Sequence, residues 1–138
     1  EEEIPHIKLR RHPWRSLKTK GSEREIPLVG ASLWAAKRIV KNGHQFAFPV
    51  YTNSARCAAN SASAALNKWL KSRTPSGCVI HSFRHSLRDR LRAVECPPDV
   101  ADAIGGWASM GVGQKYGAGF TINQKNDWIS KIALSRVT

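Results

Sequence analysis

The chain has 138 residues, 41% of them hydrophobic, with five tryptophans, which is enough for the core of one domain and excludes wholesale disorder. Lys and Arg outnumber Asp and Glu by 22 to 10, and the net charge of +12 indicates a polyanionic partner, nucleic acid first. No apolar run is long enough to span a membrane, and an acidic start (Glu1, Glu2, Glu3) is the opposite of the basic start of a signal peptide.

The N-terminal part predicts a β-hairpin. Ile4–Leu9 alternates apolar and basic residues as a strand does, and Glu25–Val29 predicts the returning strand. The polar stretch 18–24 predicts the turn between them, and Trp14–Leu17 predicts a further extended piece. Pro27 predicts that the second strand lies at a sheet edge, because proline cannot donate to the hydrogen-bond ladder.

Helical patterns begin after the hairpin. A first helix is predicted over residues 33–42, with Ser32 as its cap. The apolar run Phe46–Val50 predicts a short extended piece. The Ala-rich segment 53–71 predicts a second, longer helix, because its apolar residues recur at helical spacing.

Three more helices are predicted, over residues 82–94, over residues 98–104 and from Thr121 to about residue 136. The apolar face of the first of these is predicted to consist of Phe83, Leu87, Leu91 and Val94. Gly105-Gly106 predicts the end of the second. Together the elements predict one α+β, mainly α-helical domain over residues 1–138, in which a small antiparallel sheet is followed by a helical bundle.

Four features along this plan carry groups suited to phosphate chemistry. They are Lys18 at the hairpin, the HxxR box at 81–84, Trp107 after two glycines, and Tyr116. Each has an ordinary explanation by itself, such as a surface charge or a packed aromatic ring. Their order and spacing are more specific, because Trp107 follows the arginine of the box by 23 positions and precedes Tyr116 by nine.

In this order the features resemble the catalytic domain of the tyrosine recombinases, the phage integrase family. The stretch 18–28 (KTKGSEREIPL) resembles the lysine hairpin of the family, 81–85 (HSFRH) its second box, and 104–107 (IGGW) followed by Tyr116 its third. The family also has a first catalytic arginine, on a helix before the hairpin, which has no counterpart here. The resemblance therefore implies the recombinase catalytic core without its first helices, and a fragment that is inactive alone.

The resemblance implies site-specific DNA recombination or integration through a 3′-phosphotyrosyl intermediate. Tyr116 is the expected nucleophile. Arg84 and Trp107 are the expected donors to the phosphate oxygens. Lys18 is the expected general acid for the departing 5′-oxygen, and His81 is expected to accept the tyrosine proton or to hold a phosphate oxygen.

Other basic residues are expected to contact the DNA around the reacting phosphate. These expected DNA contacts are Lys20, Arg24, Arg56, Lys68 and His85. Lys20 also competes with Lys18 for the role of the catalytic lysine, because it lies nearer the turn.

The implied partner is double-stranded DNA, bound by a homotetramer of the full-length protein in the cytoplasm of a bacterial host. The last helix is expected to pack either on its own domain or on a neighbour in that tetramer. No cofactor or metal is expected, because the phosphotyrosyl bond conserves the energy of the phosphodiester and the ten acidic residues form no paired-carboxylate site. The three cysteines contain no CxxC pair, which argues against a zinc site or a disulfide framework and fits a reducing cytoplasm.

Two other functions remain open from the sequence. A type IB topoisomerase-like DNA strand transferase would share the phosphotyrosine step but would relax supercoils as a monomer. A basic DNA-binding module without catalysis would explain the charge and the missing first arginine, although it leaves the spacing of the other features unexplained.

Overall fold

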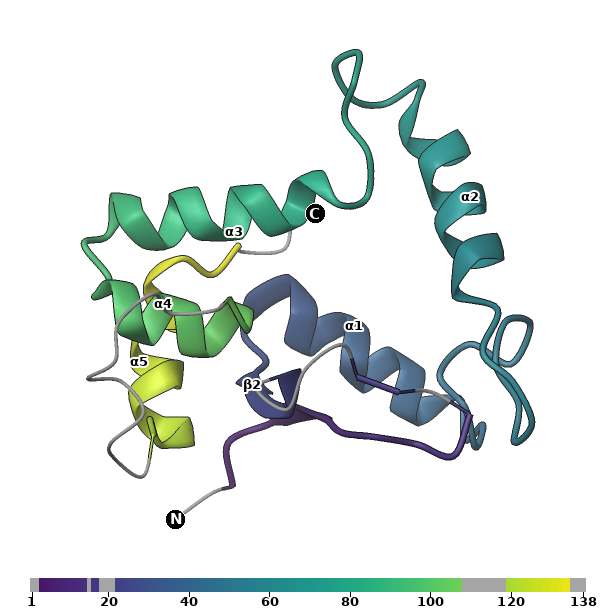
Figure 1. Cartoon of the computed structure of the whole chain (residues 1–138), viewed down its shortest axis with the longest axis horizontal. Coiled ribbons are helices and arrows are strands. Elements are labelled where there is room, and N and C mark those ends of the chain that lie inside the picture. Colours follow the sequence, from purple (N-terminus) through teal and green to yellow (C-terminus); the bar gives the residue numbers. More distant parts are fainter. Residues whose placement is uncertain (1–2, 15, 18–21, 108–118, 135–138) are drawn as a thin grey trace.

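The computed structural model describes residues 3–14, 16–17, 22–107 and 119–134 (Figure 1). These residues form five helices and a two-stranded antiparallel sheet near the N-terminus, which confirms the expected α+β, mainly helical class. No helix within these ranges is long and apolar enough to cross a membrane.

The predicted hairpin is present as strands β1 (His6–Leu9) and β2 (Arg24–Pro27), paired antiparallel. The carboxylate of Glu25 on β2 lies 3.3 Å from the Lys8 ammonium across the pair. Residues 14, 16 and 17 lie outside any strand, so the extra extended piece predicted there is wrong for the residues that are described.

Helix α1 (Gly30–Lys41) begins three residues earlier than predicted, and Ser32 is not its N-cap. The Ser32 hydroxyl instead lies in the first turn, where it accepts from the Val29 N–H at 3.1 Å and donates to the Val29 carbonyl at 2.7 Å. The Ala31 N–H donates to the carbonyl of Leu134 at 3.0 Å. This contact with residue 134 satisfies a backbone N–H of the first turn that has no partner within the helix. The sequence around the helix start does not predict it.

Helix α2 (Ala59–Leu70) begins six residues later than predicted. The Asn53 side-chain oxygen accepts from the backbone N–H groups of Ala55 and Arg56 at 2.9 and 3.0 Å, and this side-chain turn competes with helix formation. The extended piece predicted at Phe46–Val50 is also wrong, because these residues form bends and a turn.

The remaining helices begin where the sequence predicts, but the last one ends at Lys131, about five residues before its predicted end. They are α3 (Ser82–Ala93), α4 (Pro98–Gly105) and α5 (Ile122–Lys131). Gly106 ends α4 in the left-handed conformation, with φ of +64°. The Thr121 hydroxyl caps α5 by accepting from the Gln124 N–H at 3.2 Å.

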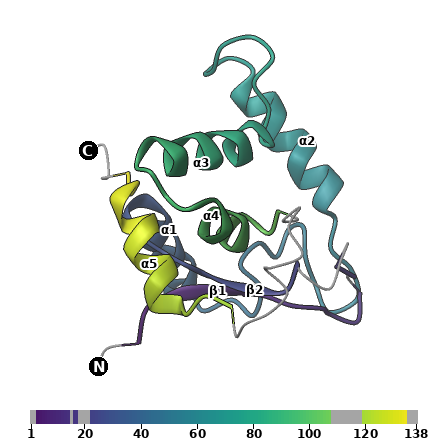
Figure 2. The same cartoon turned by 60° about the vertical axis from the view of Figure 1, so that its left-hand side comes forward.

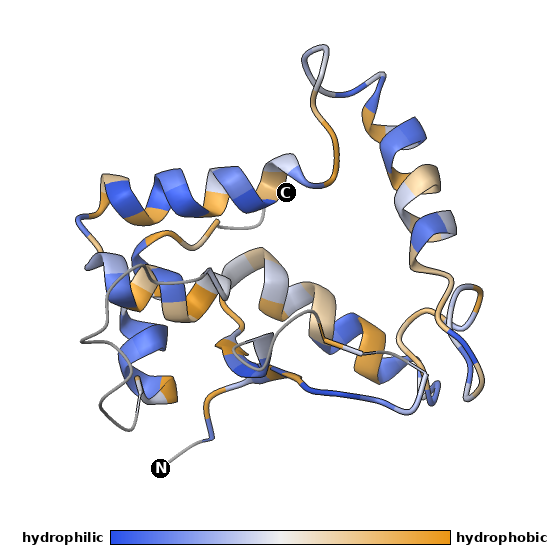
Figure 3. Cartoon of the chain, viewed as in Figure 1, coloured by the Kyte–Doolittle hydropathy of each residue, from blue (hydrophilic) through white to orange (hydrophobic). Residues whose placement is uncertain are grey.

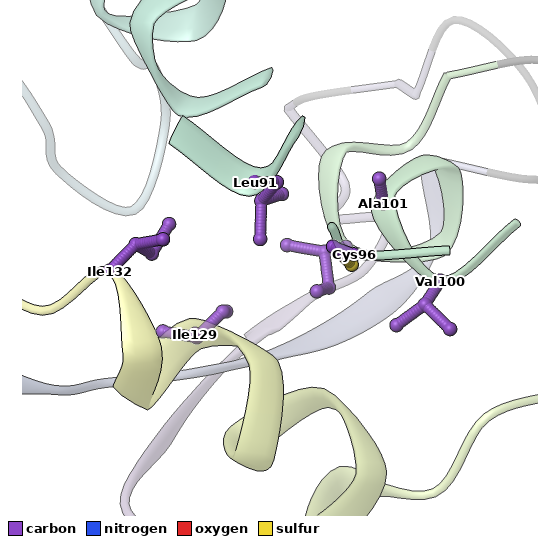
Figure 4. Close-up of a cluster of buried hydrophobic side chains, with 7 residues drawn as sticks. Leu91, Cys96, Val100, Ala101, Ile129 and Ile132 are labelled. Atoms are coloured by element: carbon purple, nitrogen blue, oxygen red, sulfur yellow. The ribbon is translucent and has the colours of Figure 1, made fainter. Parts of the chain in front are cut away.

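The core lies between α3, α4, α5 and β2 (Figure 4). Its buried members are Leu91, Cys96, Val100, Ala101, Ile104, Ile129 and Ile132. Two of them, Ile129 and Ile132, belong to the last helix and the residue that caps it, so this helix packs on its own domain. Phe83, predicted on the buried face of α3, is 62% exposed, because the core extends along this helix only as far as Leu87 and does not reach its first turn.

Helices α1 and α2 lie outside this core. No side chain of α1 is buried, and α2 buries only Leu70. Figures 1 and 2 show α2 set apart from α4 and α5, and Figure 3 shows apolar residues on α1 and on the loop that follows it. The molecule therefore has a packed side and an open side.

Candidate active site

The HxxR box lies at the start of α3, where two hydrogen bonds fix the turn that leads into the helix. The Ser82 hydroxyl accepts from the Val79 N–H at 3.1 Å, and the Asn67 side chain of α2 accepts from the Ile80 N–H at 2.7 Å. His81 and His85 are one helical turn apart and both exposed, with ring centres 5.4 Å apart. Both imidazoles are therefore accessible to a ligand.

Arg84 reaches from α3 to the C-terminal end of α4. Its Nη1 donates to the carbonyl of Gly105 at 2.6 Å, and its Cζ lies 4.6 Å from the centre of the Trp107 ring. A guanidinium at this distance from an indole is attracted by the negative face of the ring. The structure thus brings together Arg84 and Trp107, which are 23 positions apart in the sequence.

Trp107 is also contacted by a second arginine of α3, which the sequence analysis did not single out. The Cζ of Arg88 lies 4.9 Å from the centre of the same ring, and its Nη2 lies 3.3 Å from the Asp102 carboxylate. The glycine at 105 is needed for this arrangement, because a Cβ there would lie 1.9 Å from the Trp107 ring. The indole therefore folds back across Gly105 and lies beside two guanidiniums.

Arg24, predicted only as a DNA contact, approaches the same end of α4 from strand β2. Its Nε donates to the carbonyl of Ile104 at 3.0 Å, and its Nη1 donates to the carbonyl of Ser22 at 2.9 Å. Burial lowers the pKa of Arg24, and the positive charge of Arg84 lowers it further. The two guanidiniums are therefore close enough to repel each other.

We call Arg24, Arg84, Arg88 and Trp107 the arginine–tryptophan cluster. The carbonyls at the end of α4 carry the negative end of the helix dipole, which favours guanidiniums at this position. The cluster nevertheless holds three positive charges and, among the described residues, pairs with a single carboxylate, that of Asp102. A site with this excess of positive charge is suited to bind an anion such as a phosphate.

Several predicted site residues do not belong to the cluster. Lys18, Lys20 and Tyr116 lie outside the described residues. Arg56 and Lys68 are exposed, in the loop before α2 and in its last turn, and neither contacts the cluster. The expected DNA contacts among the described residues therefore fall in three places: Arg24 at the cluster, His85 in the first turn of α3, and the other two on the α2 side.

A charge pattern that the sequence analysis missed covers the open side. Residues 26–88 contain nine Lys and Arg and not one Asp or Glu. This acid-free segment comprises α1, α2 and the first half of α3. It also carries two exposed tryptophans, each covered by an arginine four residues later: Trp34 under Arg38 at 5.0 Å on α1, and Trp69 of α2 under Arg73 at 4.5 Å in the turn that follows the helix.

Comparison with protein-family models, with curated proteins and with solved structures gave no match. Among the described residues, no group of three or more His, Cys, Asp and Glu side chains is arranged to hold a metal ion. The chemistry of the site is therefore argued from the residues of this chain.

Proposed function

We propose that this chain is the catalytic part of a tyrosine recombinase, which cuts and rejoins DNA through a 3′-phosphotyrosyl bond. The observation that carries the proposal is the contact of Arg84 with Trp107, at 4.6 Å, on the end of α4. These residues come from two of the four ordered features of the sequence, and a common phosphate would require them to converge. In this proposal the hairpin and α3–α5 are the recombinase catalytic core without its first helices.

The proposed reaction has balanced bonds and protons. The Tyr116 oxygen attacks the phosphorus, so that a P–O bond to tyrosine forms while the bond to the 5′-oxygen breaks. His81, exposed at the start of α3, accepts the phenolic proton, and Lys18 or Lys20 donates a proton to the 5′-oxygen. A 5′-hydroxyl later reverses these steps, so neither a nucleotide nor a metal is consumed.

Arg84 and Trp107 act on the charge that develops at phosphorus. A guanidinium offers a planar fork of donors to two oxygens, and the indole N–H donates without being able to accept. By analogy with oxyanion donors, loss of Arg84 costs about 3–4 kcal/mol of transition-state stabilisation, which is roughly a hundred- to a thousandfold in rate.

The acid-free segment supports DNA as the partner. Nine positive charges in a segment that contains no carboxylate of its own provide the electrostatic footprint expected of a surface that contacts phosphates. Arg56 and Lys68 lie on this segment, and both side chains are exposed. In the full-length protein, we expect this surface to position double-stranded DNA within a homotetramer.

The test is covalent trapping on a nicked DNA substrate, from which the short fragment that carries the new 5′-hydroxyl diffuses away, so that religation is prevented. The full-length protein is expected to form a protein–DNA adduct, and Tyr116→Phe is expected to abolish it. Tyr51→Phe is the matched control, because Tyr51 is the other of the two tyrosines in the chain and should not affect the adduct. An adduct that persists in Tyr116→Phe contradicts the proposed nucleophile.

The same experiment separates the alternatives. Adduct formation with plasmid relaxation, but without strand exchange between two DNA sites, would indicate the topoisomerase-like function. Tight, salt-sensitive DNA binding with no adduct in any variant would indicate a DNA-binding module.

A further inference from the structure

Arg24 on β2 and Arg84 on α3 are 60 positions apart in the sequence and donate to neighbouring carbonyls. Arg24 Nε donates to Ile104 and Arg84 Nη1 donates to Gly105. The two acceptors belong to consecutive residues of α4, so both guanidiniums lie at the same end of this helix. Strand β2 and helix α3 thus deliver a pair of like charges to one end of α4.

The pair keeps N–H donors for which the described part of the chain offers no acceptor. A guanidinium has five N–H donors, and the hydrogen bonds described above use Nε and Nη1 of Arg24 and Nη1 of Arg84. Among the described residues, neither Nη2 group meets an acceptor, and neither side chain pairs with a carboxylate. Repulsion between two half-buried guanidiniums is relieved when an anion binds both.

We propose that Arg24 and Arg84 together form a two-arginine site for the reacting phosphate, so that Arg24 is a further phosphate-binding residue. The proposal rests on the proposed function and adds to it a second guanidinium, which this chain supplies from β2. Each arginine would donate to a non-bridging oxygen of the phosphodiester. The lowered pKa of Arg24 agrees with this geometry, since an anion would offset both the burial and the repulsion.

Gly106 keeps Arg24 in position. A Cβ at residue 106 would lie 2.3 Å from Arg24 Nη1, and the backbone there has φ of +64°. Alanine at this position would therefore displace the guanidinium without removing its charge. Gly106→Ala thus separates the placement of Arg24 from its charge.

The first test titrates the protein with inorganic phosphate and follows the arginine Nε–H and Trp107 indole signals by NMR. Arg24→Gln is expected to weaken phosphate binding at least about tenfold, the loss typical of a charge-assisted hydrogen bond. Arg92→Gln is the matched control, because Arg92 lies on α3, is 67% exposed and pairs with Asp89. Its effect should stay below about twofold, as expected for a screened surface charge.

Two results would overturn the two-arginine site. One is phosphate binding by Arg24→Gln within about twofold of the unsubstituted protein, and the other is an equal loss in Arg92→Gln, which would indicate diffuse attraction. Thermal unfolding of each variant shows whether it is folded. If Arg24→Gln is not, Arg24→Lys and Gly106→Ala carry the test, and both are expected to weaken binding because neither presents the fork of donors in place.

The second test measures the rate of adduct formation at saturating DNA with the full-length protein. Arg24→Gln is expected to slow it roughly a hundred- to a thousandfold, and Arg92→Gln to leave it unchanged. A normal rate in Arg24→Gln, with the adduct still lost in Tyr116→Phe, overturns the role of Arg24 alone. Absence of any adduct overturns the proposed function, and the phosphate titration still decides whether Arg24 binds the anion.

Discussion

Each helix on the packed side, α3 to α5, buries at least one apolar side chain, whereas α1 buries none and α2 buries only Leu70. The arginine–tryptophan cluster lies on the packed side, where β2, α3 and α4 meet. The open side instead keeps large apolar side chains in solvent, such as Val40 at 78% and Trp69 at 55% exposure. Rigid placement of charged groups is thus found where the apolar burial is concentrated.

The two sides also differ in charge. The packed side mixes both signs, with ion pairs such as that between Arg88 and Asp102, at 3.3 Å. The open side, α1 and α2, lies within the acid-free segment, and no ion pair is found for the lysines and arginines of these two helices among the described residues. In the proposed function the two sides have different tasks: the packed side would hold the reacting phosphate, and the open side would present positive charge to the DNA.

The largest expected difference between the sides is in stability. Leu91→Ala removes a fully buried side chain of α3 and should lower the free energy of unfolding by about 3–4 kcal/mol. Leu66→Ala on α2, where the leucine is 46% exposed, should lower it by less than about 1 kcal/mol. Urea unfolding followed by circular dichroism measures both, and equal losses would contradict the division into two sides.

Two glycines with similar backbones sharpen the comparison. Gly106 and Gly43 have φ of +64° and +69°, but a Cβ at Gly43 meets nothing within 4 Å, whereas one at Gly106 meets Arg24. Gly43→Ala should therefore cost about 1 kcal/mol of stability, for the strained backbone alone. Gly106→Ala should cost roughly 1–3 kcal/mol more, because the close approach adds to the strain. Equal losses in urea unfolding would show that Arg24 moves aside freely.

The charge difference predicts a salt effect. Lys68→Gln together with Lys71→Gln should lower the slope of log affinity for DNA against log salt by about two, if each lysine neutralises one phosphate. The melting temperature should hardly change, because both side chains are exposed. Fluorescence anisotropy at several salt concentrations checks this, and an unchanged slope would place the DNA away from α2.

Substitutions at the helix starts on the two sides should lower the global stability by unequal amounts. Thr121→Ala removes the cap of α5, which is docked in the core, and should cost about 1 kcal/mol of global stability. Ser32→Ala removes two hydrogen bonds at the start of α1 but should cost only a few tenths of a kcal/mol globally, since a helix without buried side chains frays locally. Hydrogen exchange distinguishes the two, and global loss in Ser32→Ala would show that α1 unfolds with the core.

The smallest expected effect is the pH dependence due to Cys96. Burial first and Asp99 second raise the pKa of this thiol above its ordinary value of 9.0, and Lys131 partly offsets them. The folded thiol keeps its proton where the unfolded thiol ionises, so stability falls as the pH rises from the ordinary pKa through the raised one. Cys96→Ala should remove this slope in urea unfolding between about pH 8 and pH 10, whereas Cys57→Ala, at an exposed position, should retain it. If the dependence of stability on pH persists in Cys96→Ala, it is due to another titrating group.

Local signals predicted some of these elements and failed at others for identifiable reasons. The ends of α4 and the start of α5 followed from Pro98, Gly106 and Thr121, which act on backbone groups a few residues away. Asn53 is of a residue type that often caps helices, but its side chain closes a turn before the helix instead. Phe83 belongs to the apolar stripe of α3 but lies in its first turn, which the core does not reach. A periodic pattern shows which face of a helix is apolar, but not how far along the helix other elements cover that face.

The sequence by itself determined the α+β class, most helix positions and the order of the HxxR box, the tryptophan and the tyrosine, because periodicity, caps and spacing depend on near neighbours in the chain. Only the tertiary structure decided that Arg24 meets the carbonyl of Ile104, 80 positions away, and that Arg88 joins Arg84 at Trp107. Such contacts depend on how β2, α3 and α4 pack together. That packing is a property of the whole core. Its free energy is the sum of many small contributions from buried apolar surface, so it cannot be read from any single residue.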